Sequence, residues 1–263
     1  MARRLVVTPI TYERRGSCAV VTICRPERRN AVDGPTADAL ENAYATWLAD
    51  DLAKVMILTG EGPDAFCAGA DLKALDTLAP RIQAEGGPLG FTRRIAPKPT
   101  IAAIEGWCLA GGFELALWCD LRISTETSKF GFTERRFGVP LIDGGTQRLP
   151  RVVGLGRALD LILTGRIIDA DEAGSIGLTT ETVAPGQALT RALELGEAIA
   201  AFPWDTLVAD RESTLEAQGV ALADGLISEA LRGAPTVVTG LEGAQRFSSG
   251  EGRHGSSIPP SAG

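Results

Sequence analysis

The sequence predicts an α/β core followed by a mainly helical region, and three observations lead to this fold class. Up to residue 125, apolar runs rich in strand-forming residues alternate with loops and helical stretches, which is typical of α/β folds. From residue 154 onward, apolar residues recur mainly at helical spacing. The chain has 263 residues, of which 44% are hydrophobic and 22% charged, enough for one large or two small globular domains.

Strands are predicted from short apolar runs that end at glycine or polar residues. The first two runs flank a turn at residues 14–17, and a further short strand is expected near residues 178–183. The main predicted strands cover residues 5–13, 18–24, 54–60, 100–106 and 120–125.

Helices are predicted from the spacing of apolar residues and from glycine-led turns. A Pro/Gly loop at residues 25–36 precedes a helix at 36–50, where Leu40, Tyr44 and Trp47 lie on one face. Residues 61–75 are expected to form a loop leading into a helix. The remaining predicted helices cover residues 110–119, 154–164, 169–175, 186–201, 204–231 and 235–247.

These elements predict a core over residues 1–195 and a helical C-terminal region over residues 196–250. The tail, residues 251–263, is rich in Gly, Ser and Pro, which favours flexibility. A long polar stretch covers residues 76–99, and its glycine-containing middle, residues 84–90, is expected to be mobile.

Composition argues against several functional classes. The net charge of −7 disfavours a nucleic-acid binder, because only short clusters of arginine occur. The five cysteines form no C-x-x-C pair, so neither a metal site nor a disulfide framework is expected. No apolar run is long enough for a membrane span or a signal peptide, which predicts a cytoplasmic protein without membrane contact.

The histidine content restricts the possible chemistry. The only histidine is His254, in the tail predicted to be flexible. A Ser–His or Cys–His site needs a histidine held firmly beside the nucleophile, so a peptidase of that type is disfavoured. Acid and base catalysis must therefore fall mainly to carboxylates.

Two glycine-centred turns follow predicted buried strands, at residues 66–71 and 108–115. A helix N-terminus leaves backbone N–H groups free to bind an anion. Two such turns on neighbouring strands can direct two N–H groups at one oxygen, which defines an oxyanion hole. The alternative is that each turn only connects a strand to a helix. Neither turn fits a phosphate-binding or dinucleotide-binding motif.

Two glutamates near these turns are the candidate acid and base. Glu114 lies in the first turn of the helix opened by Gly111 and Gly112, among apolar neighbours. A carboxylate there is either a helix-dipole partner or a buried group with altered protonation. Glu134 follows twenty residues later, and its alternative role is an ion pair with Arg135 or another cation.

With both turns and both glutamates in order, the sequence resembles the enoyl-CoA hydratase/isomerase (crotonase) superfamily. The resemblance runs from about residue 10 to about residue 250, and the two middle motifs are its most specific part. The motifs that carry it are RPERRNAV, AFCAGADLK, IEGWCLAGGFELALWCD, KFGFTERRFGVPLIDGGTQRLPRVVG and LTGRIIDADEAGSIGL. It implies a crotonase-like spiral of β-β-α units with a helical C-terminal trimerisation region, assembled as a homotrimer or a dimer of trimers.

The resemblance also implies an activity: hydration of a 2-enoyl-CoA thioester to a 3-hydroxyacyl-CoA, a lyase reaction of fatty acid metabolism. The backbone N–H groups of Ala68 and Gly111 are expected to hold the thioester oxygen. Glu114 is expected to activate water and Glu134 to deliver a proton to carbon. Coenzyme A is then part of the substrate, and no permanently bound cofactor is expected.

The same resemblance implies which residues bind the coenzyme A part of the substrate. Basic residues of this chain match positions that contact its phosphates, and other residues match the segment that lines the adenine and pantetheine path. For the cations, a purely solvated surface role is an equal alternative. The implied coenzyme-A-binding residues are Arg28, Arg29, Ala70, Asp71, Leu72 and Lys73.

One departure from the family pattern concerns the loop after Glu134. Ile142 and Asp143 stand where the hydratases have small residues. Asp143 is therefore a possible additional acid, or else it caps a helix or pairs with Arg148 or Arg151. The departure leaves enoyl-CoA isomerisation, or other acyl-CoA enolate chemistry involving Asp143, as the main alternative. A non-catalytic acyl-CoA-binding protein is the alternative from another functional class.

Overall fold

The apolar runs of the first half form the strands of a six-stranded sheet in the computed structural model, which describes residues 8–251. The sheet order is β1-β2-β3-β5-β7-β10. β1 pairs with β2 antiparallel, and every later neighbour is parallel. Its strands are β1 (Ile10–Arg15), β2 (Cys18–Ile23), β3 (Val55–Gly60), β5 (Thr100–Ile104), β7 (Leu121–Thr125) and β10 (Glu181–Val183).

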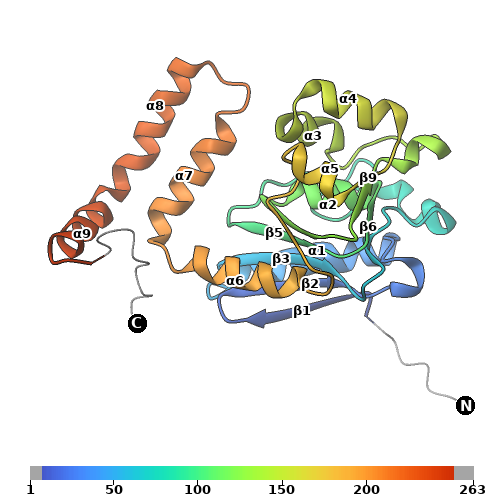
Figure 1. Cartoon of the computed structure of the whole chain (residues 1–263), viewed down its shortest axis with the longest axis horizontal. Helices are drawn as coiled ribbons and strands as arrows, with labels where there is room; N and C mark the ends of the chain where they lie inside the picture. The colour runs from blue at the N-terminus through green and yellow to red at the C-terminus, as the bar shows by residue number, and fades with distance from the viewer. Residues whose placement is uncertain (1–7, 252–263) are drawn as a thin grey trace, which may run out of the picture. The chain divides into compact units, whose positions relative to one another are not determined.

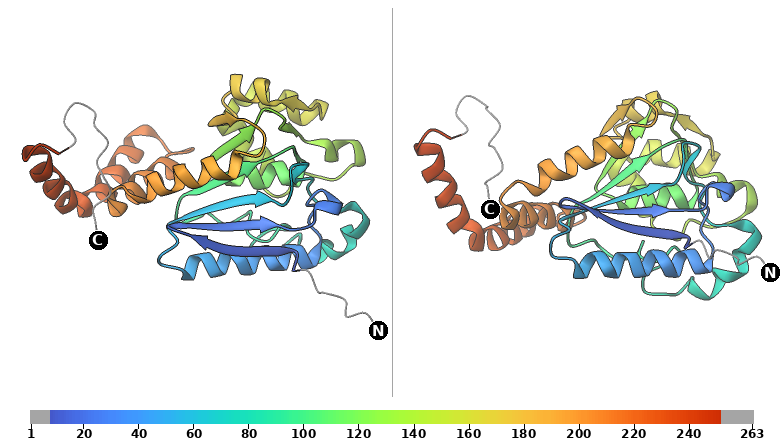
Figure 2. Two further views of the ribbon diagram at one scale, coloured as in Figure 1. Left: turned by 60° about the horizontal axis from the view of Figure 1, so that its bottom comes forward. Right: turned by 90° about the horizontal axis from the view of Figure 1, so that it is seen from below.

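The parallel strands are apolar along nearly their whole length because both faces of the sheet are covered. All five residues of β5 and five of the six in β3 are buried. In Figure 2, α1 (Gly34–Ala49) runs alongside β1 and β2.

The first strand differs from the prediction. β1 extends through Arg15, so the turn is shorter than residues 14–17, and residues 5–7 lie outside the described part.

A second sheet has four short strands in the order β4-β6-β8-β9. They are β4 (Ala65–Cys67), β6 (Trp107–Leu109), β8 (Lys129–Gly131) and β9 (Ile168–Asp169). The sequence analysis missed these strands, because two or three residues are too few to show an alternating pattern. Each of β3, β5 and β7 is followed by one of them and then by a helical segment, which is the β-β-α repeat implied by the resemblance.

The helical segments after the short strands carry the site. They are the 3-10 helix η2 (Leu72–Thr77), the α-helix α2 (Gly111–Trp118) and the 3-10 helix η4 (Thr133–Phe137). Further along the chain, α3 (Gly145–Val153), which the sequence analysis did not predict, packs against α4 (Leu155–Thr164), as Figure 1 shows. They are followed by α5 (Ala170–Ser175) and α6 (Ala188–Ala200).

The segment expected to be mobile, residues 84–90, is mostly packed into the fold, which corrects that expectation. Residues 86–92 are buried, and the Phe91 ring lies 5.4 Å from that of Tyr44 and 4.5 Å from that of Trp118. Trp118 also donates its indole N–H to the carbonyl of Arg94 at 2.7 Å. Polar and glycine-rich composition therefore did not reveal that one aromatic residue anchors the segment in the core.

The described chain divides into two units between Glu197 and Ala198. The second unit contains α7 (Trp204–Glu216), α8 (Leu222–Gly233), the 3-10 helix η5 (Ala234–Thr236) and α9 (Val237–Ser248). The single helix predicted over residues 204–231 is instead two helices, because the chain turns near Gly219, whose φ is +88°. Arg232 of α8 joins them by pairing with Glu212 and Glu216 of α7.

The C-terminal tail and a possible membrane span were also subjects of prediction. His254 and the tail predicted to be flexible lie outside the described residues, apart from Glu251. Within residues 8–251, no helix combines the length and the apolar character needed to cross a bilayer.

Candidate active site

The two glycine turns singled out in the sequence meet at the edge of the small sheet. One follows β4 and the other connects β6 to α2. Gly69 has a φ of +88°, and a Cβ there would lie 2.7 Å from the nitrogen of Gly111. A Cβ on Gly112 would collide with the carbonyl oxygen of Cys67. Glycine at these positions therefore allows two backbones to approach each other closely.

The backbone N–H groups at this junction differ from the predicted pair. The N–H of Ala68 donates to the carbonyl of Arg29 at 3.0 Å, so it is not free to bind a ligand oxygen. Within residues 8–251, the N–H groups of Ala70 and Gly111 have no hydrogen-bond acceptor, and both residues line a cavity. The positive φ of Gly69 turns the chain between Ala68 and Ala70, which sequence spacing did not reveal.

Glu114 is held by the backbone that opens α3. The residue is 3% exposed, and its Oε1 accepts hydrogen bonds from the N–H groups of Asp143 at 3.0 Å and Gly145 at 2.7 Å. Burial, followed by the charge of Asp143, raises the pKa of Glu114 to about 8, although the two N–H donors act in the opposite direction. Glu114 is thus a buried carboxyl group that titrates near neutral pH.

Glu134 lies in η4 and is 6% exposed. Neither of its carboxylate oxygens has a hydrogen-bond partner in the described part of the chain. The neighbouring guanidinium groups are directed elsewhere, because Arg135 donates to the carbonyl of Ile162 and Arg136 to that of Gly165. Burial raises the pKa of Glu134 to about 7. The alternative of a simple surface ion pair is therefore not what the structure contains.

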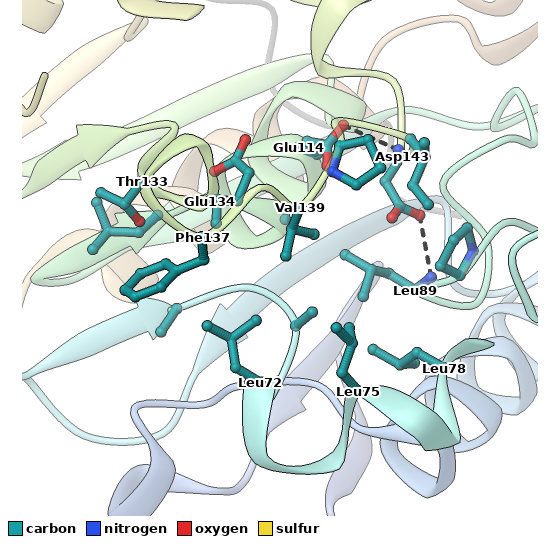
Figure 3. A pocket seen from close by; sticks show the side chains of 18 of the residues that line it. Leu72, Leu75, Leu78, Leu89, Glu114, Thr133, Glu134, Phe137, Val139 and Asp143 are labelled. Carbon is teal, nitrogen blue, oxygen red and sulfur yellow. Dashed lines mark hydrogen bonds between the residues drawn. The ribbon is translucent and has the colours of Figure 1, made fainter. Parts of the chain in front are cut away.

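Both glutamates line one cavity of about 500 Å³. Figure 3 shows their carboxylates on one side of it and the leucines of η2 and the following residue on the other. Apolar side chains form most of its wall, and among them the sequence analysis had singled out only Ala68, Ala70, Leu72 and Ile142. Others that line it are Leu75, Leu78, Ile82, Pro88, Leu89, Leu109, Phe137, Val139 and Pro140.

Comparison with known proteins identifies this architecture. The family model described as enoyl-CoA hydratase/isomerase matches residues 13–226, which is most of the chain. The chain belongs to the enoyl-CoA hydratase/isomerase family. Its predicted spiral fold is confirmed by the same comparisons, because solved enoyl-CoA hydratase structures cover nearly the whole chain.

Two relatives and one solved structure illustrate the family likeness. A probable enoyl-CoA hydratase of Rhizobium meliloti (strain 1021) is 39% identical over 82% of this chain and 85% of its own. A crotonyl-CoA hydratase of Syntrophomonas wolfei is 40% identical over 68% of this chain and 71% of its own. The crystal structure of an enoyl-CoA hydratase from Mycobacterium tuberculosis H37Rv has a TM-score of 0.87 at 35% identity, covering 92% of this chain and 96% of that one.

The coenzyme-A residues implied by the family resemblance fall into three groups. Ala70 and Leu72 line the cavity. Asp71 is buried and already occupied, because it pairs with Arg25 at 3.1 Å and accepts the N–H of Lys73. The cationic side chains of Arg28, Arg29 and Lys73 are exposed to solvent.

Asp143, the departure from the family pattern, also lines the cavity and is 4% exposed. Its Oδ1 accepts the N–H of Leu89 at 3.1 Å and the hydroxyl of Thr92. The predicted alternative of a side-chain ion pair with Arg148 is not present, since that guanidinium donates to the carbonyls of Asp143 and Thr92. Burial raises the pKa of Asp143 above its ordinary value.

Proposed function

We propose that this protein hydrates 2-enoyl-CoA thioesters to 3-hydroxyacyl-CoA, a lyase reaction of fatty acid metabolism. The relatives described above are named for this activity. The observation that supports it best is that Glu114 and Glu134 line one apolar cavity beside two backbone N–H groups that have no acceptor among residues 8–251. Two carboxylates of raised pKa are the groups that such a reaction needs for proton transfer.

The N–H groups of Ala70 and Gly111 would bind the thioester oxygen, so Ala70 replaces Ala68 in the predicted oxyanion hole. A conjugated thioester becomes electrophilic at its β carbon as negative charge develops on that oxygen. Two oriented donors stabilise this charge in a cavity with little water, and the loss of one donor costs roughly 10²–10³ in rate.

In the proposed reaction, Glu114 takes a proton from water while the water oxygen bonds to the β carbon. The resulting enolate then takes a proton at the α carbon from Glu134, and the two carboxyl groups exchange a proton with solvent to restore the starting state. The hydrogen bonds support this division, because two N–H donors favour an ionised Glu114, whereas no donor within the described residues reaches Glu134.

The pKa values of about 8 for Glu114 and about 7 for Glu134 rank the pair in the opposite order. The division of roles rests on the hydrogen bonds, because part of the rise in the pKa of Glu114 comes from the charges of Asp143 and Glu134. The contribution of each neighbour disappears when that neighbour is protonated.

The nucleotide end of the substrate would extend past Ala70 and Leu72 toward solvent. The exposed cations Arg28, Arg29 and Lys73 would contact its phosphates, while Asp71 holds Arg25 rather than the ligand. Coenzyme A enters in this proposal as part of the substrate, with no resident cofactor.

Enoyl-CoA isomerisation is the second candidate, and a third buried carboxyl group in the same cavity, Asp143, favours it. Isomerisation would move a proton between carbons without adding water. A non-catalytic acyl-CoA-binding role is less consistent with two buried carboxyl groups, because such groups are costly to retain.

The function is tested with crotonyl-CoA, following the loss of absorbance of the conjugated thioester. Glu114→Gln and Glu134→Gln should each lower turnover by about 10²–10⁴, the range usual for acid/base groups. Glu126→Gln, at an exposed glutamate, is the matched control and should keep wild-type turnover. Unchanged turnover in either cavity variant removes that residue from the mechanism, and a 3-enoyl-CoA product without net hydration would favour isomerisation.

We further propose that the protein assembles as a homotrimer or a dimer of trimers in the cytoplasm. Large apolar side chains are exposed on the helices of the second unit, which supports burial against another copy. They include Leu222, Leu226, Ile227, Leu231, Val237, Val238, Leu241 and Phe247. Light scattering coupled to size exclusion gives the mass directly, and a monomer at micromolar concentration would contradict the proposal.

A further inference from the structure

Asp143 is bonded through both its side chain and its main chain to parts of the cavity that lie far apart in sequence. Its Oδ1 accepts from Leu89 and Thr92, in the segment between η2 and β5. Its main-chain N–H donates to Glu114 of α2. A single residue thus contacts the wall of the cavity and one of the two glutamates, as the dashed lines in Figure 3 show.

Leu89 extends this connection to the proposed oxyanion hole. Its side chain is buried and lines the cavity. A Cβ placed on Gly111 would lie 2.7 Å from Leu89 Cδ1, so the leucine covers that glycine directly. The position of the Leu89 backbone therefore sets how closely the wall approaches a donor of the oxyanion hole.

Arg148 closes the same network from α3. Its guanidinium donates to the carbonyl of Asp143 at 2.9 Å and to the carbonyl of Thr92 at 2.6 Å. The two segments are therefore joined twice, once through a carboxylate and once through a cation. Such a doubly bonded junction holds the groups around it in one arrangement.

We propose that Asp143 is a positioning residue that aligns Leu89 over Gly111 and at the same time fixes the carboxylate of Glu114. This inference rests on the proposed function and concerns how the site is held for that reaction. Oδ1 of Asp143 already accepts two hydrogen bonds from the protein, so the residue serves as an acceptor in a fixed network. In the proposed hydration its role is therefore to hold these groups in place, and proton transfer is left to Glu114 and Glu134.

Two substitutions separate positioning from proton transfer. Asn in Asp143→Asn keeps a side-chain oxygen that accepts from Leu89 and Thr92 but cannot act as an acid. Asp143→Ala leaves both buried donors without an acceptor, which is costly. The exposed Asp171 provides the matched control, Asp171→Asn.

The first measurement is the dissociation constant of butyryl-CoA, a saturated thioester that cannot be hydrated, by isothermal titration calorimetry. We expect Asp143→Ala to weaken binding about tenfold, because Leu89 is then no longer held over Gly111 and must be ordered when the ligand binds. Asp143→Asn should bind within about threefold of wild type, which is rescue by the conservative variant. This measurement does not depend on which reaction the enzyme catalyses.

The second measurement is the pH profile of kcat/KM with crotonyl-CoA. Asp143 faces Glu114 together with Glu134 and Arg148, while Arg93 and Arg148 face Asp143 itself. The charge of Asp143 raises the pKa of Glu114, so removing it in Asp143→Asn should move the acidic limb to lower pH. A substitution that disturbed only packing would lower the rate without moving the limb.

The outcomes are distinct. Near wild-type kcat in Asp143→Asn, with weakened binding in Asp143→Ala and a shifted acidic limb, supports the proposal. A loss of 10² or more in kcat for Asp143→Asn, or wild-type binding in Asp143→Ala, overturns it. If Asp143→Ala does not fold, Thr92→Val removes one donor of the network and should weaken butyryl-CoA binding, and unchanged binding then overturns the proposal. Failure of wild type to hydrate crotonyl-CoA, with the binding results intact, would reject the proposed function alone.

Discussion

Replacing Glu134 by glutamine should stabilise the fold while it removes activity, and the gain should grow with pH. The carboxyl group is buried and has no hydrogen-bond partner in the part of the chain that the structure describes, and burial raises its pKa from 4.5 to about 7. Below pH 4.5 it is protonated in both the folded and the unfolded chain. As the pH rises through 4.5, the unfolded chain loses the proton first, so the free energy of unfolding falls until the pH passes about 7.

The magnitude follows from the two pKa values of Glu134. At pH 9 the carboxyl group costs about 3 kcal/mol of folding free energy, and at pH 5 it costs about 1 kcal/mol. The unpaired amide of the new glutamine has a cost of its own, but that cost does not depend on pH and cancels in the comparison. Glu134→Gln should therefore gain about 2 kcal/mol more over wild type at pH 9 than at pH 5.

The assay is urea denaturation of both proteins at pH 5 and pH 9, at one protein concentration, with Glu126→Gln as the exposed control. Turnover of crotonyl-CoA is measured on the same samples to show that stability and activity change in opposite directions. A stability difference between Glu134→Gln and wild type that stays the same at both pH values would refute the argument. It would mean that the Glu134 carboxylate is solvated in the folded protein.

Three further predictions concern the frame of the site. Ala110 has a φ of +53°, a backbone conformation in which residues with a side chain are strained. In urea denaturation, the free energy of unfolding of Ala110→Gly should stay within about 1 kcal/mol of wild type, whereas that of Ala110→Val should fall by about 2–3 kcal/mol. Equal stability of the two variants would contradict this. Gly112→Ala should abolish the hydration of crotonyl-CoA and lower the melting temperature, because the new Cβ would collide with the Cys67 carbonyl. A fully active variant would count against the close approach of the two turns. Arg122 is buried and donates to the carbonyls of Leu178 and Cys119. In urea denaturation, Arg122→Met should therefore lower the free energy of unfolding by about 3 kcal/mol. A neutral effect would show that these carbonyls find other donors.

Long periodic elements were predicted well from the sequence. The strands β2, β3, β5 and β7 and the helix α1 all coincide closely with predicted ranges, because each is long enough for its burial pattern to appear in the residues. The short strands of the second sheet were missed for the opposite reason. Their pairing depends on neighbours that are distant in sequence, such as Cys67 beside Cys108.

The candidate site shows a similar division. Local physical chemistry marked Glu114 as a carboxylate among apolar neighbours, and the family resemblance paired it with Glu134. Neither source distinguished Ala68 from Ala70 as a donor, because the direction of an N–H group depends on the backbone torsion at Gly69. The network of Asp143 also remained hidden, since its partner Leu89 lies in a stretch whose composition suggested mobility.

The sequence by itself determined which residues carry charge, which runs are apolar and where glycine permits the chain to turn, and these local properties are enough to predict the strands, the main helices and the two glutamates. Only the tertiary structure decided which N–H groups are free, which carboxylates are unpaired and which side chains form the cavity wall. The physical reason is that hydrogen bonding and burial depend on what each group meets in space. Those neighbours are set by the packing of segments that lie far apart along the chain.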